Sequence, residues 1–445
     1  GLPYSFLKVL NFIINKFKKM RFKFRYNFFF LILLVLTIFF SNHLYASNKN
    51  ILLIIADDIG VEVFPGYKDS NVKAHLPNLE KLMKQGIRCS NFWTYPTCTP
   101  TRSSIITGKF GYRTNVLNVR DRLSLKELSL QKILRKKTKN SYNDAVIGKW
   151  HLSRNPRHPN NLGISYYAGL LTGSVTNYSN WPLTIQGKTT NNDTYITTKL
   201  TDLAINWIKN QKKPWFLWLA YTAPHKPFHI PPKNLFKKED FQGNMKNNPK
   251  LKYLAMMQSM DTEVGRLLSS MSKKSLENTV ILFIGDNGTP KRVITGYKKY
   301  QGKGSLYQGG INTPFFVSGK FVKRKNEIDN SLINSTDLFA TILELAGTNI
   351  TQMHDSKSVV HLFSNQSHMH RKYVYSEISI KNYSGFTIRD NKYKYIHYSN
   401  KKYELYDILS DPLETNNLIN SKTSKIEFDQ IISKFLAIKN NEYHK

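Results

Sequence analysis

The chain has 445 residues, of which 40% are hydrophobic, and a formal net charge of +35. This length exceeds that of one small domain, and the apolar content excludes a disordered chain, so we expect one large α/β domain with an appendage. The positive charge favours polyanionic partners, although a lysine-rich solvated surface would give the same composition. The sequence carries neither zinc-ligand spacing nor a basic zipper, so we expect no nucleic-acid partner. Two cysteines, Cys89 and Cys98, exclude a disulfide framework.

The N-terminal region has the order of an export signal. Residues 16–26 carry six basic groups, and a 13-residue apolar run follows at 28–40, before the small residue Ala46. The run is shorter than the roughly 20 residues that span a bilayer. We therefore expect residues 1–46 to be a targeting segment, the protein to be periplasmic or secreted, and its contact with the membrane to be transient. An uncleaved membrane anchor is the alternative.

Short apolar runs alternate with amphipathic helix patterns over most of the chain. The predicted elements, in chain order, are a strand at 50–56, a helix at 77–85, strands at 144–147 and, after a helix at 198–210, at 215–221, a helix at 251–271, a strand at 279–285 and a helix at 336–346. The alternation predicts an α/β fold with a large, mixed, mostly parallel sheet sandwiched by helices. A polar cluster follows each strand, where such folds bind their ligands.

The pattern changes after about residue 368. Short aromatic segments separated by turns predict a smaller C-terminal subdomain built on an antiparallel sheet. The predicted organisation is thus a targeting segment (1–46), a catalytic α/β domain (47–367) and a C-terminal α+β subdomain (368–445).

Two of the polar clusters are acidic. Asp57 and Asp58 follow the first strand, and Asp286 and Asn287 follow the strand at 279–285. If these strands are neighbours, three carboxylates crowd one site, and like charges at ~4 Å repel by about 4 kcal/mol per pair. A cation would relieve that repulsion, and an all-oxygen ligand set suits Ca²⁺ or Mg²⁺. The local alternative is a helix cap and a turn.

Cys98 stands at the predicted start of a helix. Thr99 is the expected cap, Pro100 fits the first turn, and Gly108 ends the helix. A helix N-terminus favours an anion, and Arg102, one turn further on, has the planar fork that suits an oxyanion. An oxygen nucleophile would suit hard metal ions better than a thiolate, which suggests that Cys98 is modified.

The segment CTPTRSSIITGKFGYRT, which starts at Cys98, resembles the signature of the type I sulfatases, within the alkaline-phosphatase-like superfamily. Further resemblances follow in family order over about residues 50–420. They are NILLIIADDIG, GKWHL, APHKP, GDNG, GKGSLYQGGINTP and KYELYDILSDPLETNNL. The resemblance implies an alkaline-phosphatase-like fold and the hydrolysis of a sulfate ester.

In that family the signature cysteine is oxidised to formylglycine, whose hydrated aldehyde is the nucleophile. The resemblance therefore implies a formylglycine at Cys98, made by a maturation enzyme. It also implies one divalent cation, Ca²⁺ in preference to Mg²⁺. The implied metal ligands are Asp57, Asp58, residue 98, Asp286 and Asn287.

The remaining resemblances imply catalytic roles. Arg102 and Lys149 would bind the sulfate oxygens, and His225 with Lys303 would protonate the leaving alcohol. His151 would take a proton from the second hydroxyl of the modified residue 98. Two positions depart from the family pattern. They are Gln308, where a glutamate is usual, and Asn312, where an arginine is common; both bear on substrate fit rather than on catalysis.

Two other functions fit the same residues. One is a phosphodiesterase or phosphonate monoester hydrolase of the same superfamily, and the other is a non-catalytic protein that binds sulfated glycans. The charge and the export signal favour a sulfated carbohydrate as the substrate.

Overall fold

The computed structural model describes residues 49–67, 74–364, 370–420 and 425–442. The described residues belong to one unit, which begins at Lys49. The predicted targeting segment lies outside them and stays a prediction. In the described ranges, no helix combines the length and the apolar character that crossing a bilayer requires.

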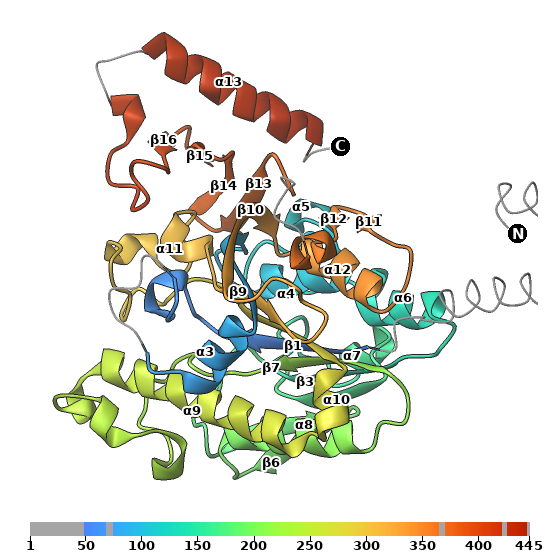
Figure 1. The fold of residues 1–445 in the computed structure, drawn as a ribbon. Helices are drawn as coiled ribbons and strands as arrows, with labels where there is room; N and C mark the ends of the chain where they lie inside the picture. Colours follow the sequence, from blue (N-terminus) through green and yellow to red (C-terminus); the bar gives the residue numbers. More distant parts are fainter. Residues whose placement is uncertain (1–48, 68–73, 365–369, 421–424, 443–445) are drawn as a thin grey trace, which may run out of the picture. The chain divides into compact units, whose positions relative to one another are not determined.

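A ten-stranded sheet forms the centre of this unit (Figure 1). From edge to edge its strands are β10 (Glu327–Asn334), β2 (Gly86–Trp93), β9 (Phe315–Ser318), β8 (Thr279–Gly285), β1 (Asn50–Ala56), β7 (Trp215–Ala220), β3 (Asn143–Gly148), β4 (Tyr166–Gly169), β5 (Trp181–Ile185) and β6 (Lys188–Asn192). Strands β8, β1, β7, β3 and β4 run parallel to one another. Because β9 is antiparallel to both neighbours, the sheet is mixed, and the predicted fold class is confirmed.

Strand β1 lies in the middle of the sheet and is buried along its whole length. Its side chains alternate between two cores, with Ile51, Leu53 and Ile55 in one and Leu52 and Ile54 in the other. Successive residues of a strand point to opposite faces, so a strand covered on both faces must be apolar throughout. This is why the run NILLIIA has no polar alternation.

Helices cover both faces of the sheet (Figure 1). One face carries α3 (Pro77–Lys84), α8 (Ile196–Lys209) and α9 (Pro249–Ser270), and the other carries α4 (Cys98–Thr107), α6 (Leu130–Lys137) and α12 (Asp337–Leu345). Four shorter helices are α5 (Gly111–Thr114), α7 (His158–Asn161), α10 (Lys273–Glu277) and α11 (Gln308–Ile311). The helix predictions agree with α3, α8, α9 and α12 to within two residues at each end.

A second, antiparallel sheet follows in the chain. Its strands are β13 (Val374–Ile380), β14 (Tyr383–Arg389), β15 (Tyr393–Tyr398) and β16 (Tyr403–Asp407), and α13 (Lys425–Glu442) packs on it; a two-stranded ribbon of β11 (Gln352–Met353) and β12 (Ser356–Lys357) precedes it. Tyr375 and Phe386 of this sheet share a core with Phe435 of α13 and with Tyr95 and Phe110 of the larger part. The predicted antiparallel sheet is thus confirmed, whereas the domain boundary at residue 368 stays a prediction.

Helix α4 begins two residues earlier than the sequence suggests. Thr97 is the N-cap, with an extended backbone, and Cys98 is already the first helical residue. The prediction that Thr99 caps the helix is therefore wrong, because the chain leaves its extended conformation two residues sooner. Gly108 ends the helix in the left-handed conformation, at φ 67°, as predicted. Cys89 and Cys98 are both free thiols.

Candidate active site

The side chains that follow four adjacent strands of the large sheet meet beyond the carboxyl ends of those strands. The ten predicted site residues lie there: Asp57 and Asp58 after β1, Lys149 and His151 after β3, His225 after β7, Asp286 and Asn287 after β8, Cys98 and Arg102 on α4, and Lys303 in the loop before α11. Because β8, β1, β7 and β3 are consecutive in the sheet, residues from distant parts of the sequence become neighbours.

Three carboxylates form the floor of the site. Asp57, Asp58 and Asp286 are each 1% exposed or less. The backbone N–H of Asp58 donates to Asp286 Oδ1 at 3.1 Å, and the Asn287 side chain donates to Asp58 Oδ1 at 2.8 Å. Asp58 takes the left-handed conformation, at φ 71°, which an aspartate tolerates better than most residues. The two acidic segments are therefore joined by hydrogen bonds at the floor.

Arg102 is wholly buried and binds the carboxylate of Asp286. Its Nε and Nη2 donate to Asp286 Oδ2 at 3.1 and 2.7 Å, and its Nη1 donates to the Lys149 carbonyl at 2.7 Å. All three guanidinium nitrogens therefore bind protein groups, so the fork of Arg102 fixes one carboxylate and the loop after β3.

Two lysines neutralise the other carboxylates. Lys149 forms an ion pair with Asp57, and Lys303 forms one with Asp58. Burial alone would raise the pKa of Asp58, but Lys303, His225 and Lys149 hold it below its ordinary value. Burial raises the pKa of Asp57 to about 8, because Lys149 opposes it only in part and Asp286 adds to it. Positive charge at this floor is therefore favourable.

Cys98 faces His151 across the site. Its Sγ lies 3.1 Å from His151 Nδ1, and burial raises the pKa of the thiol despite the nearby Lys149. Burial, followed by the charge of Lys149, lowers the pKa of His151, so the imidazole is neutral in this site. A side-chain Cβ at Gly173 would lie 2.2 Å from His151 Cε1 and 2.3 Å from Nε2. Only glycine leaves room for the ring in this position.

His225 approaches the floor from β7. Its Nε2 lies 3.7 Å from Asp58 Oδ2, and its Nδ1 donates to the Lys226 carbonyl at 2.8 Å, since a carbonyl can only accept. The Tyr178 hydroxyl donates to the carbonyl of His225 at 2.6 Å and thereby anchors this loop. Burial lowers the pKa of His225 to about 3, with Asp58 acting in the opposite direction. The ring therefore presents a free nitrogen to the site.

The donor atoms at the floor fit a hard divalent cation. Asp57 Oδ1 and Asn287 Oδ1 are buried without a hydrogen-bond partner among the described residues. Ligand atoms of Asp57, Cys98 and Asp286 lie within 4.8 Å of one another, as do those of Asp57, Asp58 and His225. Orphaned buried oxygens are costly unless a ligand satisfies them. The carboxylates and the amide oxygen of Asn287 are the kinds of donor that Ca²⁺ and Mg²⁺ bind.

The floor opens into a cleft of about 1180 Å³. Sequence reasoning missed several residues that line it: Val119, Arg120, Arg154, Thr172, Gly173 and Ser174. The stretch after β4 matches no family motif strongly enough to transfer a role. The two arginines are also indistinguishable, in sequence, from the other basic residues of a strongly basic chain.

The loop that carries Lys303 is fastened to the C-terminal part of the chain. The Gln301 side chain donates to the carbonyls of Leu413 and Glu414, at 2.9 and 3.2 Å. The Gln308 backbone donates to Glu414 Oε2 at 2.6 Å, and its side chain accepts from the Trp93 indole at 2.9 Å. Gln308, one of the two departures from the family pattern, is thus a buried structural residue. Asn312, the other, donates to the Ser90 carbonyl at 3.1 Å.

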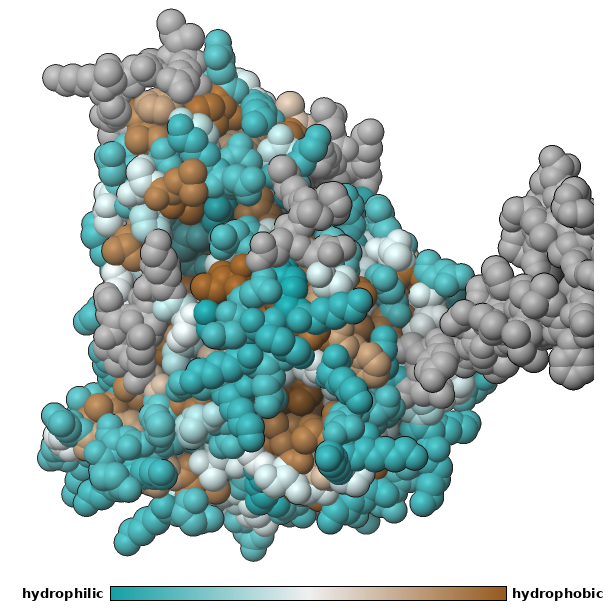
Figure 2. Space-filling model, viewed as in Figure 1, coloured by the Kyte–Doolittle hydropathy of each residue, from teal (hydrophilic) through white to brown (hydrophobic). Residues whose placement is uncertain are grey.

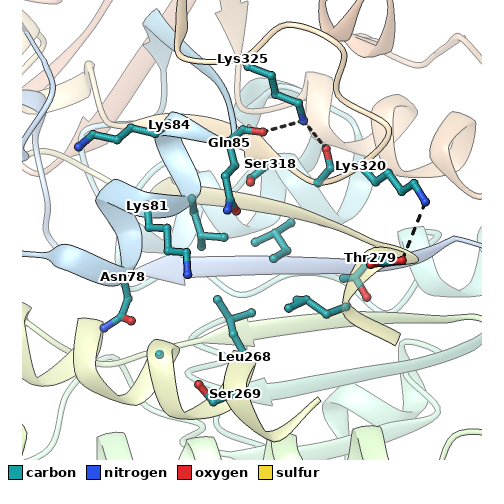
Figure 3. A pocket seen from close by; sticks show the side chains of 16 residues that line it. Asn78, Lys81, Lys84, Gln85, Leu268, Ser269, Thr279, Ser318, Lys320 and Lys325 are labelled. Atoms are coloured by element: carbon teal, nitrogen blue, oxygen red, sulfur yellow. Dashed lines mark hydrogen bonds and ion pairs between the residues drawn. The ribbon is translucent and has the colours of Figure 1, made fainter. Parts of the chain in front are cut away.

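A second hollow, of about 640 Å³, lies between α3, α9 and α10, at the amino end of β8. Figure 2 shows a hydrophobic depression there, framed by hydrophilic side chains. Leu82, Leu268 and Ile281 line it, while Lys81 and Lys84 stand at its edge (Figure 3). Its described lining contains one carboxylate, Glu277, and neither histidine nor cysteine, so it offers no catalytic set.

A mostly parallel sheet, with a cysteine at a helix N-terminus beside a floor of buried carboxylates, is the arrangement of the alkaline-phosphatase-like class. Within that class the chain belongs to the sulfatase family, whose family model matches residues 49–348. A second model, described as the C-terminal region of N-sulphoglucosamine sulphohydrolase, matches residues 296–441. The family predicted from the sequence motifs is therefore confirmed.

Individual relatives agree with this assignment. Arylsulfatase J of the mouse (Mus musculus) is 27% identical over 325 residues, which are 67% of this chain and 53% of that protein. The arylsulfatase of Clostridium perfringens is 24% identical over 86% of this chain and 92% of its own length. The crystal structure of Ps i-CgsB in complex with k-i-k-neocarrahexaose is similar with a TM-score of 0.74 and 26% identity, over 88% of this chain and 92% of that one. The chain thus spans about half the length of the mouse relative.

Proposed function

We propose that this protein hydrolyses a sulfate monoester, with residue 98 as the nucleophile after its oxidation to formylglycine. One observation carries the proposal. Cys98 Sγ lies 3.1 Å from the His151 base and within 4.8 Å of ligand atoms of Asp57 and Asp286, in a chain of the sulfatase family. The proposed nucleophile, the proposed base and the carboxylates that would bind a cation therefore lie next to one another.

The free thiol is poorly suited to this site. Burial raises the pKa of Cys98, so the reactive thiolate is scarce near neutral pH. A hydrated aldehyde at this position supplies two hydroxyl groups, one to attack sulfur and one whose deprotonation releases sulfate. A formylglycine-generating enzyme is accordingly a proposed partner.

We assign the cation site to Asp57, Asp58, Asp286 and Asn287, together with the oxygen of the modified residue 98. Ca²⁺ is preferred to Mg²⁺, because the site offers several carboxylate and amide oxygens and Ca²⁺ takes more such ligands than Mg²⁺. When bound, the cation acidifies the attacking hydroxyl and offsets charge on the sulfate oxygens.

The chain's own side chains divide the remaining tasks. His151, neutral and in contact with residue 98, takes the proton whose loss releases sulfate. His225 and Lys303 both face Asp58 at the floor, where an incoming sulfate raises the pKa of His225 and enables it to protonate the leaving oxygen. Lys149 adds positive charge for the sulfate oxygens. Arg102, whose nitrogens all bind protein groups, is a positioning residue for Asp286.

The proposed substrate is a sulfated carbohydrate, and the proposed location is outside the cytoplasm. The first rests on the structural neighbour solved with a neocarrahexaose and on the net charge of +35. The second rests on the basic, apolar and small-residue order of the first 46 residues, and N-terminal sequencing of protein recovered from the natural source tests it.

The function is tested with the full chain produced beside a formylglycine-generating enzyme. Mass spectrometry of the peptide around residue 98 is expected to show the lower mass of the aldehyde. The protein should release 4-nitrophenol from 4-nitrophenyl sulfate faster than from 4-nitrophenyl phosphate, and Cys98→Ala should not. Removal of metal by a chelator should abolish turnover, and Ca²⁺ should restore it. A preference for the phosphate ester would favour a phosphoester hydrolase, and an unmodified thiol without turnover would favour a binding protein.

A further inference from the structure

The mouth of the active-site cleft is lined by basic side chains. The six basic side chains in its lining, besides Lys303 at the floor, are Arg120, Arg154, Lys226, Lys252, Lys291 and Arg292. None of the six forms an ion pair with a described carboxylate. Among the described residues that line the cleft, one is acidic, Asp58, and it is buried at the floor. We call these six side chains the cationic rim.

The cationic rim comes from both sides of the sheet. Arg120 and Arg154 lie in segments whose neighbours Leu123 and Leu152 belong to the core under α4. Lys252 lies on the first turns of α9, on the opposite face. The other members follow β7 and β8. An anion held in the cleft is therefore approached by positive charge from two directions.

Such an arrangement is unfavourable unless something negative occupies it. Like charges around a concave surface repel, and low-dielectric walls concentrate their field in the cleft. The sulfate ester to be hydrolysed is one anion, and we have assigned to it Lys149, Lys303 and the cation that the floor carboxylates would hold. The rim charges lie at the mouth, so they remain available for other anionic groups.

The same lining has apolar elements. Val119, Pro227, Phe228, Pro249 and Pro290 stand among the rim cations. Apolar side chains suit the faces of sugar rings, and guanidinium forks suit planar pairs of sulfate oxygens. A lining that combines apolar and basic side chains fits a carbohydrate that carries several sulfates.

We infer that the cationic rim is a second anion-binding site, which holds further sulfate groups of the carbohydrate whose sulfate ester is cleaved at the floor. This inference rests on the proposed function. It narrows the substrate from a sulfated carbohydrate to an oligosaccharide with sulfates on the residues that flank the reacting one. A monosulfated sugar fills the floor and leaves the rim unused.

The test compares two ligands on matched variants. The formylglycine-containing full chain hydrolyses 4-nitrophenyl sulfate, and the sulfated neocarrahexaose is added as a competitor beside a monosulfated galactose. We expect a Ki for the hexaose at least tenfold below that of the monosulfated sugar. The double variant Arg120→Ala/Arg154→Ala should raise the hexaose Ki about tenfold, which equals 1.4 kcal/mol, and should weaken its dependence on salt. Its effect on kcat/KM for 4-nitrophenyl sulfate should be several times smaller.

The chain offers a control of equal charge. Lys81 and Lys84 are exposed at the second hollow (Figure 3), at the amino end of β8 and away from the cleft. Lys81→Ala/Lys84→Ala removes the same two charges and should leave both Ki values and kcat/KM unchanged. Equal losses for the hexaose in the two double variants would overturn the inference, because net charge alone would explain the binding. Equal losses for the hexaose and the aryl sulfate in the rim variant would overturn it as well.

Failure of the proposed function gives a different result. If neither the formylglycine-containing wild type nor any variant hydrolyses 4-nitrophenyl sulfate, the proposed sulfatase function is refuted. Calorimetric binding of the hexaose to Cys98→Ala, with and without the rim substitutions, then still decides whether the cationic rim binds polyanions. Circular dichroism melting of each variant checks that the substitutions leave the fold intact.

Discussion

Gly173 is predicted to set the position of His151, the proposed base. In Gly173→Ala the new Cβ would lie 2.2 Å from His151 Cε1, whereas ordinary contacts begin at 3.4 Å. The ring must therefore retreat by roughly 1 Å, a displacement that is enough to cost about 10²-fold in rate when it misaligns a catalytic group. It would also break the 3.1 Å contact between His151 Nδ1 and residue 98. We expect kcat for 4-nitrophenyl sulfate to fall about 10²-fold, or about 2.7 kcal/mol.

The assay is a double-mutant cycle with His151→Ala. If Gly173 acts only through the ring, Gly173→Ala lowers kcat in the wild type but has no further effect when His151 is absent. The melting temperature should change little, because Gly173 lies at the cleft surface and its φ is not in the left-handed range. Wild-type kcat in Gly173→Ala, or the same loss in both backgrounds, would refute this reasoning.

Three further outcomes follow from buried charges. Arg102→Met, studied in chelator-treated protein, should lower the free energy of unfolding in urea by about 3–5 kcal/mol, because it leaves Asp286 unpaired. Glu414→Gln should cost about 3 kcal/mol, since Lys394 is 0% exposed, and adding Lys394→Met should recover part of that loss. Burial raises the pKa of Glu377 to about 7, from 4.5 in the unfolded chain. The folded state therefore binds the extra proton between these values, and this residue's contribution to stability should fall by about 3 kcal/mol as the pH rises from 4.5 to 7. Glu377→Gln should flatten that part of the stability profile, and an unchanged slope would contradict the assignment.

The central strands and the long helices were predictable because their signals are local. The run NILLIIA predicts a buried strand, and the spacing of Leu79, Leu82 and Met83 predicts a helix with one buried face, each from a few consecutive residues. Because α/β folds bind ligands beyond the carboxyl ends of their parallel strands, the sequence alone also predicted that the residues after these strands form one site. Strand order, which places β8 beside β1, could not be read from any single segment.

The elements that sequence reasoning missed have no such signal. Strand β9 has four residues, and β10 mixes polar and apolar positions because it lies at the edge of the sheet. Arg120 and Arg154 line the cleft because of their tertiary neighbours, and no local sequence pattern predicts that position. The same holds for Gly173, whose role depends on a ring 22 positions earlier in the chain.

The hydrogen bonds from Gln301 to the carbonyls of Leu413 and Glu414 join the loop of Lys303 to a segment that is synthesised near the end of the chain. The signature helix and the acidic residues after β1 and β8 are synthesised early, whereas Leu413 and Glu414 lie in the last tenth of the chain, so these two hydrogen bonds form only after that part has emerged. A nascent molecule can thus contain Cys98 and the buried carboxylates while its Lys303 loop still lacks these two hydrogen bonds. Shortening the chain from its far end would then remove this support of the loop without altering any of the ten predicted site residues.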